Sequence, residues 1–188
     1  MKEIFSTPIW TYQYKNFDQQ YIENVLIEFK KNNPTRQKSN LHGYQSDSKL
    51  TDLVELHPLF NWICSRSVDA LTNQNFVFNN LNIGAWCNFN ETRSAMNYPH
   101  AHEGTLSGVF YVKAPPHSGR LILQNPGMNS LWQGIKFCKE KSSFTSEAVF
   151  VEPREGDLIL FPSYLPHFVE PNLHDDARIS ISFNILLE

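Results

Sequence analysis

From Phe76 to the C-terminus, the sequence is a succession of short segments rich in Val, Ile, Phe and Tyr, separated by Gly, Pro and Asn. This pattern is typical of short strands joined by turns. The expected strands lie within residues 76–90, 105–114, 119–125, 147–152, 157–162, 167–170 and 178–187. The sequence therefore predicts a β-sandwich or small barrel over residues 76–188.

Residues 1–75 are expected to form a helical support region. Between Asp18 and Asn32 the apolar residues recur at helical spacing, and Asp18 is a suitable N-cap. A second helical segment is expected within residues 49–74, where Pro58 suits the first turn of a helix. The polar stretch 32–48 is expected to be a loop. The 188 residues thus predict a single α+β domain that is mainly β, with both helices packed on a sheet.

Composition excludes several classes of function. Sixteen Lys and Arg against nineteen Asp and Glu give a net charge of -3, which argues against a nucleic-acid partner. Cys64, Cys87 and Cys138 are too scattered for a disulfide framework or a CxxC metal site. No apolar run is long enough for a membrane span, and the N-terminus does not have the pattern of a signal peptide. We therefore expect a cytoplasmic protein with no membrane partner, and a homodimer is the commonest arrangement for such a domain.

The last expected strand alternates between two kinds of side chain. Large apolar residues occupy one set of positions and small polar residues the other: Ile179, Ile181, Phe183 and Ile185 against Ser180, Ser182 and Asn184. Because successive side chains of a strand point to opposite faces, the apolar set is expected in the core. The polar set is then expected to face a cavity.

Three histidines lie at the ends of expected strands, beside turn residues. Residues two apart on an extended segment point to the same face, so His100 and His102 are able to approach one metal ion. A third ligand has to come from a distant strand, and His167 is the candidate, expected to face the first pair across the barrel. Imidazole suits Fe, Zn, Cu and Ni alike. The alternative is a pair of surface histidines on a polar turn.

Arg178 and Ser180 are two residues apart on the last expected strand and project from the same face. An arginine fork beside a hydroxyl group is suited to binding one carboxylate. The alternative is an edge-strand arginine that pairs with Asp175 or Asp176 in water, which contributes little energy.

Three motifs, HAHEGTLSGVFYV, PREGDLILFPSYLPHFVEP and RISISFNI, occur in this order in the sequence. In this order they resemble the Fe(II)- and 2-oxoglutarate-dependent oxygenases, most closely a family found in bacteria and cyanophages. The resemblance covers roughly residues 82–187. It implies a double-stranded β-helix, or jelly roll, with the helices packed behind its major sheet.

The resemblance also implies a set of iron ligands, namely His100, His102 and His167. Most enzymes of the wider superfamily have Asp or Glu at the position of His102, so a neutral imidazole there leaves the iron site one unit more positive. Glu103 is an alternative ligand, but we rank His102 above it because adjacent side chains on an extended segment diverge.

For the cosubstrate, the resemblance implies that Arg178 and Ser180 hold the distal carboxylate of 2-oxoglutarate. Asn88 and Tyr111 lie on neighbouring expected strands and are further candidates for hydrogen bonds to it. Aromatic residues in strands usually serve packing, which is the alternative for Tyr111.

The implied activity is hydroxylation of a C–H bond in a small molecule or a peptide, with release of succinate and carbon dioxide. If a phage encodes the chain, the compartment is the cytoplasm of its host. A second hypothesis is a cupin-type three-histidine dioxygenase or isomerase, but TLSGV lacks the Glu that cupins have there. A third is a catalytically silent jelly-roll module that binds a carbohydrate or a protein. Neither alternative uses Arg178 and Ser180 as a pair.

Overall fold

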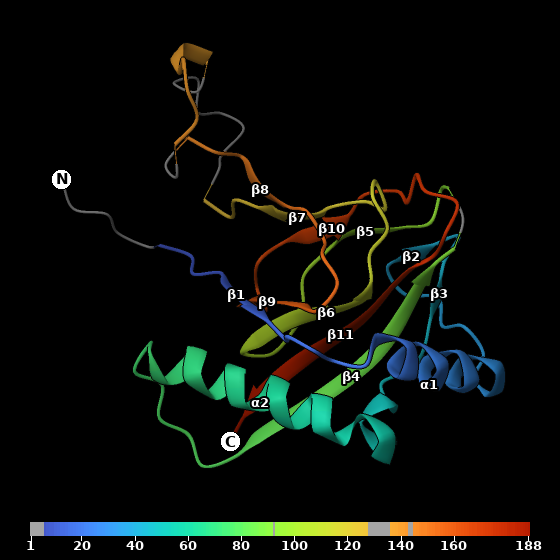
Figure 1. Ribbon diagram of the computed structural model, residues 1–188. Helices are drawn as coiled ribbons and strands as arrows, with labels where there is room; N and C mark the ends of the chain where they lie inside the picture. Colours follow the sequence, from blue (N-terminus) through green and yellow to red (C-terminus); the bar gives the residue numbers. More distant parts are fainter. Residues whose placement is uncertain (1–5, 92, 128–135, 143–144) are drawn as a thin grey trace.

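A computed structural model describes residues 6–91, 93–127, 136–142 and 145–188. The described residues form two antiparallel sheets with two α-helices on one side (Figure 1). The major sheet has the order β1 (Trp10–Gln13), β9 (Asp157–Pro162), β6 (Leu106–Lys113), β11 (Arg178–Leu187), β4 (Leu81–Asn90) and β3 (Tyr44–Gln45). The minor sheet has the order β2 (Asn40–Leu41), β5 (Met96–His100), β10 (His167–Val169), β7 (Leu121–Gln124) and β8 (Ala148–Val151).

Both predicted helices are present. Helix α1 (Gln19–Asn32) begins after Asp18, whose side chain accepts a hydrogen bond from the backbone N–H of Tyr21 at 2.9 Å. Helix α2 (His57–Thr72) carries Pro58 in its first turn, after the short 3-10 turns η1 (Leu50–Asp52) and η2 (Val54–Leu56). Figure 1 shows both helices along the side of the major sheet that faces away from the minor sheet. This is the predicted packing behind the major sheet.

Two apolar clusters hold these layers together. The larger one joins the helices to the outer face of the major sheet, and it includes Ile22, Leu26, Leu59, Ile63, Ile179, Ile181, Phe183 and Ile185. The smaller one lies between the sheets and includes Val109, Leu121, Leu123, Ile159 and Phe161. The apolar set of β11 is therefore in the core, as predicted. Ser180 and Ser182 point the other way, into the space between the sheets, where they line a cavity.

The structure contains four strands that the sequence analysis does not predict. Strand β1 extends the major sheet beside β9, and β5 runs through Pro99 to His100. Strands β2 and β3 are only two residues each and lie in the stretch 32–48, which was expected to be a loop. Residues before position 75 thus contribute strands to both sheets as well as the two helices. Conversely, β4 begins at Leu81, later than the expected start at Phe76.

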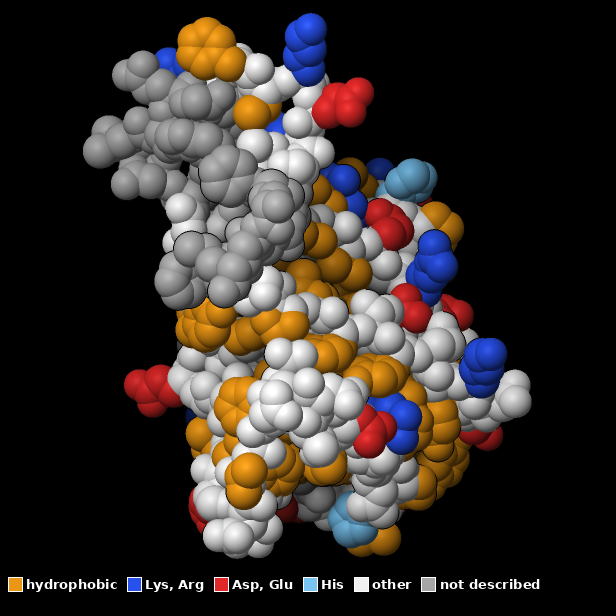
Figure 2. Space-filling model, turned by 90° about the vertical axis from the view of Figure 1, so that its left-hand side faces the viewer, with side chains coloured by type: hydrophobic (Ala, Val, Ile, Leu, Met, Phe, Trp, Pro, Cys, Tyr) orange, Lys and Arg blue, Asp and Glu red, His pale blue; other side chains and the backbone are white. Residues whose placement is uncertain are grey.

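Several large apolar side chains are exposed, among them Val54, Val77 and Phe137. Figure 2 shows one face of the molecule, where hydrophobic side chains are spread over the middle and the lower part. Exposed apolar side chains are ordinary on protein surfaces. Within the described residues, neither helix has the length and apolar character needed to cross a membrane.

Candidate metal centre and cosubstrate pocket

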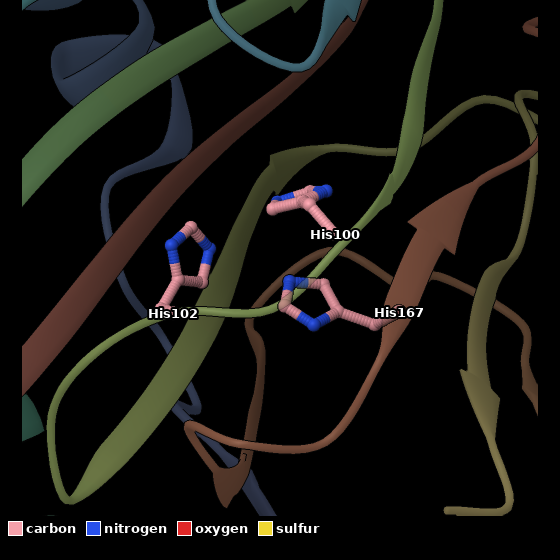
Figure 3. A group of neighbouring side chains, drawn as sticks. All are labelled: His100, His102 and His167. Atoms are coloured by element: carbon pink, nitrogen blue, oxygen red, sulfur yellow. The ribbon is translucent and has the colours of Figure 1, made fainter.

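His100, His102 and His167 come together at one end of the space between the sheets (Figure 3). Their ligand atoms all lie within 4.8 Å of one another, and Figure 3 shows the three rings turned toward a common centre. The ring centroids are 4.7 Å apart for His100 and His102, 4.4 Å for His100 and His167, and 5.2 Å for His102 and His167. In the described part of the chain, these three histidines are the group of His, Cys or acidic side chains close enough together to hold a metal ion. Glu103 does not belong to this group.

Strand pairing explains how the sequence brings these rings together. His100 ends β5 and His167 begins β10, and the two are direct cross-strand partners in the minor sheet. His102 lies two residues beyond β5, where the chain leaves the minor sheet, and its backbone N–H bonds to the carbonyl of Ser163 at 2.9 Å. The expectation that His167 faces the pair across the barrel is therefore wrong in geometry, because it lies beside His100 in the same sheet.

Two of the rings are oriented by backbone carbonyls. Nδ1 of His100 is 2.6 Å from the carbonyl oxygen of Tyr98, and Nδ1 of His167 is 2.8 Å from that of Leu165. A carbonyl only accepts hydrogen bonds, so each Nδ1 carries the proton and donates it. Nε2 then keeps its lone pair, which is the state that a metal ligand requires.

Burial keeps two rings of the ligand cluster, those of His102 and His167, uncharged. Desolvation, followed by the neighbouring His100, lowers the pKa of His102 to about 4. Desolvation also lowers the pKa of His167 to about 4, although the hydrogen bond to Leu165 acts in the opposite direction. At neutral pH both rings are therefore neutral and need lose no proton to bind a metal ion.

Arg178 lies at the start of β11 with only 2% of its surface exposed. Its Nη1 donates hydrogen bonds to the carbonyl oxygens of Ser118 at 2.7 Å and Gly119 at 2.9 Å, while its Nε is buried with no partner in the described residues. Burial lowers its pKa to about 10, so it stays charged at neutral pH. The surface-pair alternative is wrong, since Arg178 is buried and Asp175 pairs with Arg93.

A row of polar side chains runs across the major sheet beside Arg178. In the strand pairing, Ser180 on β11 lies opposite Asn88 of β4 on one side and opposite Tyr111 of β6 on the other. Asn88 donates through Nδ2 to the hydroxyl of Ser182 at 3.0 Å, but its Oδ1 is buried with no partner among the residues that the structure describes. Burial raises the pKa of Tyr111 to about 12, so its hydroxyl group remains protonated. The row thus places hydroxyl and amide groups side by side in the space between the sheets.

One cavity connects the two groups of residues. All seven predicted site residues line it: His100, His102, His167, Arg178, Ser180, Asn88 and Tyr111. Ser39, Asn97 and Phe161, which no sequence pattern singles out, line the cavity too. Asn97 is buried beside the histidine pair and donates to Ser39 at 3.1 Å, but an asparagine three residues before His100 gives no distinctive signal.

A wider groove opens at the metal end of this cavity. It is lined by residues of the segment 36–48, by Tyr98 and Pro99, and by Asn184. Ser39, Trp86, His100 and His102 line both the groove and the cavity, so the two meet at the ligand cluster. The predicted iron ligands are thus reached from the surface through the groove, and Glu103 lines neither space.

Comparison with protein families identifies the chain. Residues 84–184, more than half of the sequence, match the model of the family described as "Putative 2OG-Fe(II) oxygenase". The chain belongs to this family. It is therefore an Fe(II)- and 2-oxoglutarate-dependent oxygenase, and the family assignment made from the three motifs is confirmed. The cupin and silent-module alternatives lose their support. A search of curated proteins found no match.

Solved structures share the fold of the oxygenase. A prolyl-4-hydroxylase from Pseudomonas putida superimposes with a TM-score of 0.66 at 12% identity, covering 97% of this chain and 94% of that one. HygX from Streptomyces hygroscopicus, with nickel and 2-oxoglutarate bound, gives 0.62 at 13% identity over 96% and 83%. A Trichoplax adhaerens prolyl hydroxylase, in complex with a hypoxia inducible factor peptide, gives 0.62 at 12% identity over 95% and 83%. The predicted double-stranded β-helix is confirmed.

Proposed function

We propose that this oxygenase hydroxylates a C–H bond of a small molecule or peptide, while 2-oxoglutarate is oxidatively decarboxylated. In balanced form, R–H, dioxygen and 2-oxoglutarate give R–OH, succinate and carbon dioxide. The observation that carries the proposal is that the three histidines and the row from Arg178 to Tyr111 line one cavity, which is open to the surface at its metal end.

The residues fit Fe(II). His100, His102 and His167 offer three imidazole nitrogens in a compact group, two of them with their second nitrogen already satisfied by a carbonyl. Imidazole is a common ligand of iron, and three ligands leave coordination positions for other groups. Imidazole binds a metal ion as a neutral ligand, so the ion would keep its full charge of +2, which favours binding of a dianion. When bound, the metal and cosubstrate supply the redox chemistry that side chains cannot provide.

The residues fit 2-oxoglutarate as well. Arg178 carries a buried positive charge and an unpartnered Nε, which together favour a carboxylate at that end of the cavity. The hydroxyl groups of Ser180 and Tyr111 would add donors to the carboxylate, and Asn88 would border the cosubstrate. In this arrangement the chain fixes both ends of the keto acid, and the surrounding apolar side chains exclude water from it.

The groove supports an extended substrate. It reaches the ligand cluster between the segment 36–48 and residues Tyr98 and Pro99 of strand β5, and its walls combine two aromatic rings with charged and hydroxyl groups. A prolyl hydroxylase of the same fold is known with a peptide bound. We therefore include peptides among the substrates proposed for this site.

Turnover under isotopically heavy dioxygen tests the reaction. The protein is incubated with Fe(II), 2-oxoglutarate and fractions of a peptide library or a metabolite extract. The expected result is one heavy oxygen atom in succinate and one in a product, both lost in His167→Ala. Label in succinate alone, with every fraction, would contradict hydroxylation.

A further inference from the structure

The three histidines are not held alike. The rings of His100 and His167 each donate a hydrogen bond to a backbone carbonyl, at 2.6 and 2.8 Å. The ring of His102 has no hydrogen-bond partner within the described residues, and its nearest neighbours are other rings, including that of Trp86 at 5.7 Å between centroids. Only the backbone of His102 is fixed, by its bond to Ser163.

The positions of the histidines in the fold add to this difference. His100 and His167 are paired across adjacent strands of the minor sheet. His102 lies outside the strands, two residues before Gly104, whose φ of +134° marks a turn that L side chains rarely adopt. It borders the open groove, as His100 does, whereas His167 is buried. His102 is therefore the ligand with the fewest restraints and with space beside it.

The hydrogen bond on the second ring nitrogen matters for metal binding. Such a partner fixes the orientation of the ring and raises its basicity, and its loss typically weakens metal affinity or activity 10- to 100-fold. His102 lacks this support, so the bond from its ring to a metal ion is expected to be the weakest of the three.

The groove also favours a particular kind of replacement ligand. Arg36 and Lys38 line it. Among the described residues on its walls, the only carboxylate is that of Asp47, which lies 3.8 Å from Arg36 and accepts a hydrogen bond from the backbone N–H of Lys49. The cationic side chains lower the energy of an anion near His102, as does a metal ion held by neutral ligands.

We propose that His100 and His167 are the permanent metal anchors, and that His102 is an exchangeable ligand whose position a small carboxylate entering through the groove takes. In the exchange one bond from the metal to an imidazole nitrogen breaks and one to a carboxylate oxygen forms, with no change of oxidation state. The inference rests on the proposed function, since it assumes that the three histidines bind the metal.

Metal affinity of single variants provides the first test. Each histidine is changed to Ala, and Co(II) binding is measured by competition with a chelator. We expect His102→Ala to weaken binding less than tenfold and the other two variants to weaken it more than 100-fold. Equal losses would overturn the inference. If a metal-free Ala variant is unfolded by circular dichroism, the Gln variant of that residue replaces it.

Formate provides the second test, as the simplest carboxylate. Added formate is expected to restore Co(II) affinity in His102→Ala but not in His100→Ala, and to change the visible spectrum of the Co(II)-loaded wild type. Lys38→Gln is expected to weaken the formate effect several-fold, with Lys49→Gln, an exposed lysine outside the groove, as the matched control. Absence of any formate effect would overturn the inference, whereas absence of metal binding by the wild type would instead overturn the proposed function.

Discussion

Replacing Arg178 by Met separates binding of the cosubstrate from folding. The guanidinium group is buried, and its pKa is lowered from 12.5 to about 10, which corresponds to a desolvation cost of roughly 3 kcal/mol. Met removes this cost but also loses two hydrogen bonds to the carbonyls of Ser118 and Gly119, each contributing about 1.5–3 kcal/mol. The two effects partly offset each other, so we expect the variant to fold with a stability loss of at most about 3 kcal/mol.

Binding of 2-oxoglutarate is expected to weaken as a separate effect. Loss of the charge-assisted contact to its distal carboxylate costs about 1.5–3 kcal/mol, or roughly a 10- to 150-fold rise in Kd. The assay is anaerobic calorimetry of the Fe(II)-loaded protein with 2-oxoglutarate, alongside urea denaturation of the metal-free form. Arg93→Met, which removes an exposed arginine paired with Asp175, is the matched control. A Kd within twofold of the wild type, with iron binding intact, would refute the role of Arg178.

Three further predictions concern neighbouring groups. Ser180→Ala is expected to raise the Kd of 2-oxoglutarate about tenfold by removing one hydroxyl donor, and calorimetry showing no change would exclude that contact. Gly119→Ala is expected to lower the free energy of unfolding by at least about 2 kcal/mol in urea titrations. At Gly119 φ is +94°, and a Cβ there would lie 2.2 Å from the carbonyl oxygen of Glu170. An unchanged urea midpoint in this variant would contradict the packing. In the metal-free protein the unfolded chain takes up a proton at His167 below about pH 6.5, whereas the folded chain does so only near pH 4. Protonation of His167 should therefore lower the stability by roughly 3 kcal/mol as the pH drops through this window, in addition to the effect of His102, whose pKa is also lowered to about 4. A profile equally steep in His167→Asn would contradict this contribution.

Periodicity predicted those parts of the site that depend on local geometry. The alternation along β11 placed Ser180 and the apolar residues correctly, because a strand with one buried face has little choice of register. The two-residue spacing of His100 and His102 likewise brought both rings to one point. Family resemblance, and not periodicity, supplied the roles of these residues.

Other features depend on contacts between distant segments. Strand β5 contains Pro99 and polar residues, so its pattern is not that of a strand, and it forms because β10 and β2 pair with it. For the same reason the place of His167 beside His100 was not predicted. The carbonyl groups that hold Arg178 belong to a turn sixty residues earlier in the chain, and no side-chain pattern marks them.

If one cavity binds Fe(II) and 2-oxoglutarate together, an anaerobic titration detects both components at the same site. Metal-free protein is titrated with Fe(II) and then with 2-oxoglutarate, and the visible charge-transfer band of the keto acid chelated to iron is followed. We predict a saturable band that requires both components, disappears in His167→Ala and needs more 2-oxoglutarate in Arg178→Met. Absence of the band, together with absence of calorimetric heat for 2-oxoglutarate, would contradict the account.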